Sequence, residues 1–336
     1  MITIKDIANA AGVSHATVSR VINNGPKVGD ETRKRVKQVM QELGYRPNAN
    51  ARALVTQKHS ALGVVVAELL DPFFATLAHG IDSVARQQNI QLLMSAGSIE
   101  KDTELQAIDT LMQHRCEAMV VHSKALDDDT LIEFAGQIPG FVLINRYIPQ
   151  IAHRCVWLDN TAGGKVMTQH LLDLGHRKFA VISSRYQIDD PSERLQGIRN
   201  TLHAAGLTLD DSHIEYSSPD QKGGEHAMRH LLARGVDFTA VLAYNDAMAS
   251  GAMTTLSDHG LQVPTDASIV GFDDVLLAKY CHPKLTTLHY PIEMMAVKAA
   301  ELALAYARGE PTSTTHTYKY TPTLVKRDSA AQVHPR

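Results

Sequence analysis

The chain has 336 residues, of which 44% are hydrophobic and 21% charged, and its length exceeds that of one ordinary hydrophobic core, so we expect two or three domains. Its formal net charge of −3 has the wrong sign for a protein that only grips nucleic acid. No apolar run reaches the roughly 18 residues of a membrane span, and charged residues interrupt the N-terminal MITIKDIANAAGV, unlike a secretory signal, so we expect a cytoplasmic protein with no membrane partner.

The charge is unevenly distributed along the chain. Residues 1–58 contain ten Lys and Arg against four Asp and Glu, whereas the remainder contains 23 basic and 32 acidic residues. A basic N-terminal segment on an acidic body predicts a nucleic-acid contact confined to one end.

Residues 1–46 carry the spacing of three short helices. The first has an apolar stripe at i, i+3, i+4 and i+7 after a Thr3 cap, and Gly12-Val13 turns the chain. Ser14 is expected to cap the second helix, and Asp30 to cap a third that ends at Gly44. Two short helices joined by a tight turn and braced by a third predict a helix-turn-helix domain, although each helix alone also fits a plain amphipathic helix.

The second helix presents polar residues opposite its buried stripe. Arg20 suits guanine O6 and N7, His15 can reach a base edge, and Ala16 offers apolar contact to a thymine methyl. The remaining polar residues suit phosphate oxygens. The candidate DNA contacts in this domain are Ser14, His15, Ala16, Thr17, Ser19, Arg20 and Asn23.

Residues 47–58, which include NANARAL, favour a helix of barely two turns. A helix this short is marginal in water and needs a partner to bury it. Leu54 could gain that burial as an apolar wedge in the minor groove, or the segment could be a plain linker. The candidate DNA contacts here are Asn48, Asn50 and Leu54.

TIKDIANAAGVSHATVSRVINN and YRPNANARAL together resemble the DNA-binding head and hinge of the LacI/GalR family of bacterial transcription regulators. The resemblance implies that two hinge helices pair across a homodimer and insert a leucine into a palindromic operator, and that residues 15, 16 and 20 read bases. His15 stands where galactose-responsive members carry valine, a difference that bears on the operator sequence rather than on the sugar.

Residues 59–330 alternate β-rich runs with helical stretches. The expected strands are LGVVVAE, IQLLMSA, AMVVH, FVLINR, CVWLD, FAVISS, AVLAYN, SIVGF and TTLHY. Because these runs are apolar throughout, they predict parallel sheets covered on both faces, and their number predicts two α/β lobes with a cleft between them. In such sheets ligands bind beyond the carboxyl ends of the strands.

Polar and aromatic residues collect at those strand ends. A mixture of aromatic faces, carboxylates, amides and guanidinium suits the C–H surface and the hydroxyls of a sugar. For any single residue, a helix cap is an equally good interpretation. The candidate ligand-binding residues are Asp71, Phe73, Phe74, Asn145, Arg146, Asp189, Arg194, Asn245, Asp246 and Asp273, with Asp190 in the same stretch as Asp189.

Enzymatic and metal-binding patterns are missing from the sequence. GGKVMT at 163–168 lacks the spacing of a P-loop, and no GxSxG, HExxH or GxGxxG occurs. The 17 histidines are scattered, and Cys116, Cys155 and Cys281 are isolated, which indicates reduced thiols in a core. We expect neither catalysis nor a cofactor.

The body resembles the periplasmic-binding-protein-type core of the same family, and most closely its galactose-responsive members, through stretches such as HRCEAMVVHSKAL, RLQG and FTAVLAYNDAMASGAM. The resemblance implies a first lobe of about 59–158 and 291–318 and a second of about 160–288 and 320–327. It implies a galactose-like effector contacted by Arg194, Asn245 and Asp273. The tail, 331–336, lacks a heptad repeat, so a dimer is expected rather than a tetramer.

Together these features predict a nucleoid-associated transcriptional repressor of galactose transport and catabolism genes that a bound sugar releases from its operator. Another sugar or a corepressor remains an alternative within the same family. A cytoplasmic sugar-binding protein and a sugar-metabolising enzyme are alternatives from other classes, but neither explains residues 1–58.

Overall fold

The computed structural model describes residues 2–23, 25–45, 61–312 and 317–333. The chain forms two compact units, residues 1–60 and 61–336, which we call the head and the body. No helix in the described ranges is long and apolar enough to span a membrane.

The head consists of three helices, as its spacing predicted: α1 (Ile4–Ala11), α2 (His15–Ile22) and α3 (Asp30–Glu42). Thr3 and Asp6 form a reciprocal capping box at the start of α1, and Gly12 ends it at φ 63°, a conformation that favours glycine. The Ser14 side chain accepts a hydrogen bond from the Thr17 amide and caps α2.

The start of α3 differs from the sequence prediction. Gly29 occupies the cap position without a side-chain hydrogen bond, and Asp30 is the first helical residue. A carboxylate in the first turn still stabilises the helix because it faces the positive end of the helix dipole. The three helices bury one small apolar cluster, built around Ile7, Ala8, Ala11, Val18, Val21 and Val36.

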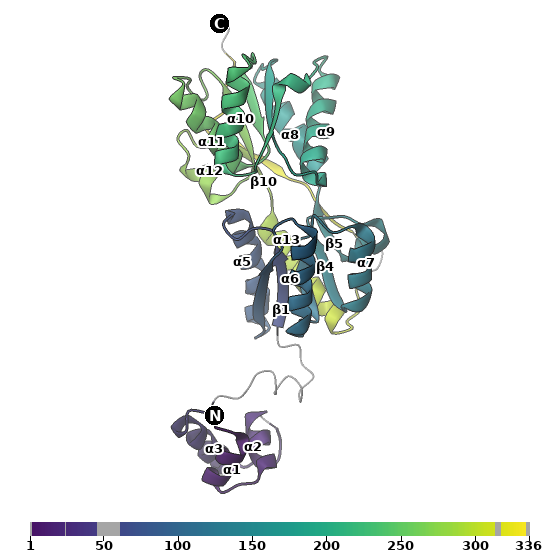
Figure 1. The fold of residues 1–336 in the computed structure, drawn as a ribbon, viewed down its shortest axis with the longest axis vertical. Coiled ribbons are helices and arrows are strands. Elements are labelled where there is room, and N and C mark those ends of the chain that lie inside the picture. The colour runs from purple at the N-terminus through teal and green to yellow at the C-terminus, as the bar shows by residue number, and fades with distance from the viewer. Residues whose placement is uncertain (1, 24, 46–60, 313–316, 334–336) are drawn as a thin grey trace. The chain divides into compact units, whose positions relative to one another are not determined.

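The first lobe of the body is a six-stranded parallel sheet in the order β11-β5-β4-β3-β1-β2. Its strands are β1 (Ala61–Val66), β2 (Gln91–Ala96), β3 (Ala118–Val121), β4 (Gly140–Ile144), β5 (Cys155–Leu158) and β11 (Tyr318–Tyr320). Its helices are α5 (Pro72–Gln87), α6 (Lys101–Gln113), α7 (Asp128–Gln137) and α13 (Ile292–Ala307), with a 3-10 turn at Pro149–Arg154 (Figure 1).

The second lobe repeats this plan with the order β12-β10-β9-β8-β6-β7, in which only β12 is antiparallel. Its strands are β6 (Phe179–Ser184), β7 (Ile214–Ser217), β8 (Ala240–Ala243), β9 (Ser268–Asp273), β10 (Thr286–His289) and β12 (Thr323–Val325). Its helices are α8 (Asn160–Asp173), α9 (Asp189–Ala204), α10 (Gln221–Ala233), α11 (Asp246–Asp258) and α12 (Leu276–Tyr280), with a 3-10 turn at Asp211–His213.

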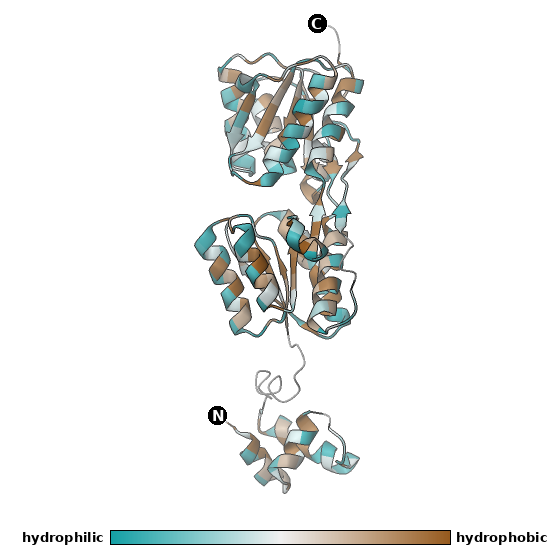
Figure 2. Ribbon diagram, turned by 90° about the vertical axis from the view of Figure 1, so that its right-hand side faces the viewer, coloured by the Kyte–Doolittle hydropathy of each residue, from teal (hydrophilic) through white to brown (hydrophobic). Residues whose placement is uncertain are grey.

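The chain crosses between the lobes three times, after β5, after β10 and between β11 and β12. Most central strands are buried along their whole length, and Figure 2 shows their apolar character inside each lobe. This arrangement confirms the predicted two-lobed α/β class with parallel sheets. The edge strand β2 departs from the expectation of full burial, because its side chains are partly or largely exposed.

Candidate DNA-binding helix and ligand cavity

Helix α2 carries the predicted base-reading residues on its exposed side. His15, Ala16 and Arg20 are exposed, whereas Thr17, Ser19 and Asn23 are partly buried. The hydroxyl of Ser14 is already engaged, because it accepts from the Thr17 amide at 3.1 Å and lies 2.9 Å from the Thr17 hydroxyl. Ser14 therefore fixes the start of the helix, and the exposed face is free to meet a base edge. Asn48, Asn50 and Leu54, from the predicted hinge, lie outside the described residues.

The body contains a cavity between the carboxyl ends of its two sheets, as expected for ligand sites in such folds. Its volume is about 80 Å³, which is smaller than the range of about 300–1,000 Å³ typical of small-molecule sites. The lining residues are Asp71, Phe73, Phe74, Ile99, His122, Asn145, Tyr186, Ile188, Asp190, Arg194, Pro219, Tyr244, Asn245, Asp273 and Tyr290.

One side of this cavity is a buried polar cluster that joins the two lobes. The Lys124 ammonium, from the first lobe, lies 2.7 Å from a carboxylate oxygen of Asp190 at the start of α9 in the second. Asn145 donates to the other oxygen of Asp190 at 3.0 Å and accepts from the Tyr290 hydroxyl at 2.5 Å. Burial alone would raise the pKa of Asp190, but the charges of Lys124 and Arg194 outweigh it and lower that pKa. Asp190 is therefore held ionised by its partners.

A second set of polar groups, which we call the open side of the cavity, keeps free hydrogen-bonding capacity. It is joined to the first set through Asn160, which donates to Asp190 at 3.4 Å. Arg194 donates through Nε to Asn160 at 2.9 Å and through Nη1 to the Tyr244 carbonyl at 2.6 Å. Its guanidinium stacks 3.5 Å from the centroid of the Phe272 ring, and no partner is found for Nη2 among the described residues.

Asp273 also lies on this open side. It adopts φ 108°, a backbone conformation rare for residues with a Cβ and frequent at functional sites. Burial raises the pKa of its carboxyl well above the ordinary value, although the nearby Arg194 opposes the shift. A ligand hydroxyl would give this carboxyl the partner that the described protein groups do not supply.

Three aromatic rings form the apolar wall of the cavity. The centroids of Phe73 and Phe74 are 5.2 Å apart and those of Phe73 and Tyr290 4.9 Å apart, both pairs packed edge to face. Asp71 accepts from the Phe73 amide at 2.9 Å, which fixes the start of α5 and so the position of both phenylalanines.

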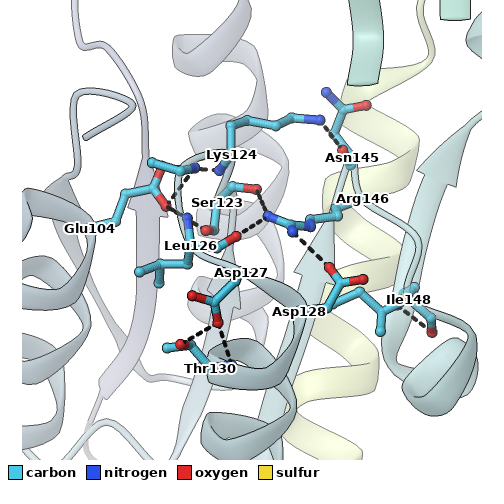
Figure 3. Close-up of polar contacts among 12 residues, drawn as sticks. Glu104, Ser123, Lys124, Leu126, Asp127, Asp128, Thr130, Asn145, Arg146 and Ile148 are labelled. Atoms are coloured by element: carbon cyan, nitrogen blue, oxygen red, sulfur yellow. Dashed lines mark hydrogen bonds and ion pairs between the residues drawn. The ribbon is translucent and has the colours of Figure 1, made fainter. Parts of the chain in front are cut away.

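Three predicted ligand-binding residues lie outside the cavity lining. The Arg146 guanidinium points into the loop after β3, where it donates to the Leu126 carbonyl and to Asp128, both at 2.7 Å (Figure 3). Asp189 is exposed on α9. Asp246 is fully buried and accepts from the Thr287 hydroxyl at 2.5 Å and the Val275 amide at 3.0 Å.

Asn245 has two roles, because it lines the cavity and also caps α11. Its side chain accepts from the Met248 amide and donates to the Pro219 carbonyl, each at 2.9 Å. For this residue the cap that the sequence left open as an alternative is present.

The loop after β3 is held by a carboxylate that the sequence did not single out. Glu104 on α6 is almost fully buried and accepts from the Ser123 hydroxyl and from the amides of Lys124, Ala125 and Leu126 at 2.5–3.2 Å (Figure 3). Four donors on one carboxylate fix the loop, and with it the base of Lys124.

Sequence reasoning missed several lining residues, among them His122, Tyr244 and Tyr290. His122 directly follows β3 and Tyr290 directly follows β10, so the strand-end rule that selected the other candidates could have found both. No cluster of His, Cys, Asp or Glu among the described residues is arranged to hold a metal ion.

A helix-turn-helix head and a two-lobed body with a polar cavity define a class of protein, the ligand-responsive regulator of transcription. Residues 3–48 match the family model described as bacterial regulatory proteins of the lacI family. Residues 59–308 match the one described as periplasmic binding proteins and sugar binding domain of LacI family. The chain belongs to the LacI family of DNA-binding transcriptional regulators, which confirms the resemblance predicted from its sequence.

Relatives match nearly the whole chain. It is 47% identical to the HTH-type transcriptional regulator GalR of Salmonella typhimurium, over 98% of this chain and 96% of that protein. It is equally identical to GalS of the same organism, over 98% and 97%. The structure of the lac repressor dimer bound to operator and the anti-inducer ONPF aligns with a TM-score of 0.85 at 25% identity, covering 98% of this chain and 99% of that one. A complex of the regulator CelR with cellobiose aligns with a TM-score of 0.72 at 30% identity, covering 98% and 100%.

Proposed function

We propose that this regulator represses galactose transport and catabolism genes and that D-galactose, or a close relative, releases it from a palindromic operator. The observation that carries the proposal is the cavity between the lobes, which combines an aromatic wall with carboxylate, amide and guanidinium groups. The match to GalR and GalS over nearly the whole chain supports the choice of sugar. Acting on bacterial DNA would place the protein in the cytoplasm.

The cavity offers what recognition of a hexose requires. Phe73 and Phe74 present apolar surface to the C–H face of the ring, while Arg194 and Asp273 offer a donor and a carboxyl to its hydroxyls. A site built to pair hydroxyls discriminates strongly against analogues that lack one, because its own polar groups then stay unpaired.

A homodimer would bring two heads to one operator. Two regions of the body expose apolar side chains suited to a second copy: Leu70 (90% exposed) and Met94 (43%) in the first lobe, and Tyr280 (70%) in the second. The half-exposed edge strand β2, which carries Met94, fits the same role. Two linked heads on a palindrome gain affinity through effective concentration.

Sugar binding would act on the DNA through the relative position of the lobes. The ligand would close the cavity, shift one lobe against the other, and move the paired hinge segments out of the spacing that lets them fold on the operator. A coupling of about 1–3 kcal/mol changes operator affinity about 5- to 150-fold. By reciprocity, operator DNA must weaken galactose binding by the same factor.

Calorimetry of the full-length protein against galactose, glucose and ribose tests the ligand. Galactose should bind most tightly, and a stronger response to glucose or ribose would contradict the proposal. Gel shifts on an operator selected from random DNA then test whether the sugar lowers or raises operator affinity. Galactose should weaken the complex, whereas a corepressor would strengthen it. Equal galactose affinity with and without operator would exclude the proposed coupling.

The hinge part of the proposal rests on Leu54. Leu54→Ala should lower operator affinity roughly tenfold or more, because it removes the apolar wedge that buries the hinge on DNA. Gln57→Ala, in the same segment, is the matched control and should leave operator affinity unchanged. Gel shifts of both variants decide the matter: unaltered binding by Leu54→Ala would place the coupling elsewhere.

A further inference from the structure

Helix α10 carries two histidines one turn apart on its exposed face. Of the 17 histidines in the chain, only His226 and His230 are separated by four positions. Both are exposed, whereas Ala227, Met228 and Leu231 of the same helix are buried in the lobe. Side chains four positions apart on a helix are neighbours, and the centroids of these two rings are 4.0 Å apart. The helix therefore presents two imidazoles side by side to solvent.

A carboxylate orients one of these rings. Nδ1 of His230 donates to Oε1 of Glu215, on β7, at 3.2 Å. Because an ionised carboxylate only accepts hydrogen bonds, Nδ1 carries the proton and the lone pair of the ring is at Nε2. Histidines that ligate metals almost always make such a contact, since it fixes the tautomer and raises the basicity of the ligating nitrogen.

The positive charges on this face of the helix are compensated. Arg234 lies 2.8 Å from the other carboxylate oxygen of Glu215, and Arg229 lies 3.6 Å from a carboxylate oxygen of Glu225. Each arginine thus has a glutamate partner, so a cation bound at the imidazoles would not meet an uncompensated positive charge.

We propose that His226 and His230 form a chelating site for a divalent transition-metal ion such as Zn²⁺, Ni²⁺ or Cu²⁺. Imidazole is a ligand suited to these ions. Two histidines at i and i+4 on one helix face also bind zinc in metalloproteases, where a glutamate between them is the general base. Ala227 stands at that position here, so the pair predicts metal binding without hydrolysis.

The ion would be held by two protein ligands. Among the described residues, no group of three or more His, Cys, Asp or Glu is placed to hold a metal ion. Water would complete the coordination, which leaves the site open and its binding reversible. Neither histidine lines the cavity between the lobes, so this site is independent of the proposed response to sugar.

Calorimetry of the full-length protein with Zn²⁺ tests the site. His226→Gln and His230→Gln should each weaken Zn²⁺ binding roughly tenfold or more, because a single imidazole lacks the gain in effective concentration that chelation gives. The double variant should bind little more weakly than either single variant. Cu²⁺ should bind the wild type more tightly than Zn²⁺, and Mg²⁺, which prefers oxygen ligands, should not compete with it.

Reaction of the histidines with diethyl pyrocarbonate, followed by peptide mass spectrometry, locates the ion. Zn²⁺ should protect His226 and His230 from the reagent. It should not protect His203, which is exposed on α9 and has no second histidine four positions away.

Controls separate chelation from other effects. His203→Gln should bind Zn²⁺ as the wild type does, and Glu215→Gln should weaken binding less than either substitution on α10. Glutamine favours a helix at least as well as histidine, so urea unfolding of the histidine variants without metal should match the wild type. Unchanged Zn²⁺ binding in His226→Gln or His230→Gln, or losses that simply add in the double variant as for two separate sites, would overturn the inference.

Discussion

The two sides of the cavity use similar residues in opposite ways. On one side Lys124, Asp190, Asn145 and Tyr290 satisfy one another across the lobes. On the other side the carboxyl of Asp273 and the Nη2 of Arg194 have no partner among the described groups. The comparison indicates a division of labour: the paired side fixes how the lobes meet, and the open side is left for a ligand.

The largest effect should come from breaking the paired side. Lys124→Met leaves the Asp190 carboxylate buried without its cation, and removing one partner of a buried ion pair costs about 3–5 kcal/mol. We expect a loss of that order in the free energy of unfolding of the body, measured in urea.

Lys178→Met is the matched control, because it breaks an ion pair with Asp237 in which both side chains are more than half exposed. An exposed pair contributes at most about 1 kcal/mol. If the two variants lose the same stability, the buried cluster does not join the lobes in the way described.

The next effect concerns the open side. Arg194→Lys cannot reach Asn160 and the Tyr244 carbonyl and still present a nitrogen to a ligand, since lysine has a single charged nitrogen. Galactose affinity should fall roughly 10- to 100-fold, as expected for hydrogen bonds to a charged group. Arg185→Lys, at an exposed position of the same lobe, should leave it unchanged in calorimetry.

Arg146 tests whether a residue next to the cavity lining can stabilise the body without contacting the ligand. Arg146→Gln removes its bonds to Leu126 and Asp128, so the body should lose about 1–2 kcal/mol, but galactose affinity should change less than about threefold. Arg154→Gln is the matched control, because Arg154 also donates to two backbone carbonyls of this lobe. A selective loss of sugar binding in Arg146→Gln would restore the ligand contact predicted from the sequence.

The fold was largely predictable because buried parallel strands are continuous apolar runs. All nine expected strands are present, whereas β7, with its short polar IEYS, and the three-residue β11 and β12 were missed. Short edge strands bury too little apolar surface to mark themselves in a sequence. The first lobe was expected to end at about residue 318, but β11 keeps the chain in its sheet through Tyr320. The short β11 was not recognisable in the sequence, so the crossing was placed slightly too early.

The cavity was predictable as a place but not side chain by side chain. Of each adjacent pair Asn145-Arg146, Asp189-Asp190 and Asn245-Asp246, one residue lines the cavity and its neighbour does not. These pairs stand where a strand gives way to a turn or a helix, as at Asn145 (φ 58°) and at the starts of α9 and α11, and a composition rule at a strand end does not say which neighbour faces the ligand. That choice depends on the turn that follows each strand.

The smallest effect should be seen in two carboxylates of the cavity, Asp273 and Asp190, whose contributions to stability should change with pH in opposite directions. The pKa of Asp273 is raised by burial, so its unfolded form ionises above about pH 4 while the folded form resists. Stability associated with Asp273 is thus present at low pH and lost as the pH rises. Asp190 is the reverse: its lowered pKa gives stability above the unfolded value of 3.8, which is lost as the pH falls.

Urea unfolding of sugar-free protein at pH 4 and pH 7 measures how the free energy of unfolding of each variant changes with pH. Relative to wild type, Asp273→Asn should gain stability between pH 4 and pH 7, and Asp190→Asn should lose it. Asp189→Asn, at an exposed position on the same helix as Asp190, should show neither trend. Each unit of pKa shift corresponds to about 1.4 kcal/mol, and because Asp273 is only partly buried, water in the cavity reduces its share. If the Asp273→Asn and Asp190→Asn variants both lost stability between pH 4 and pH 7 relative to wild type, both carboxylates would be paired. The distinction between the two sides of the cavity would then disappear.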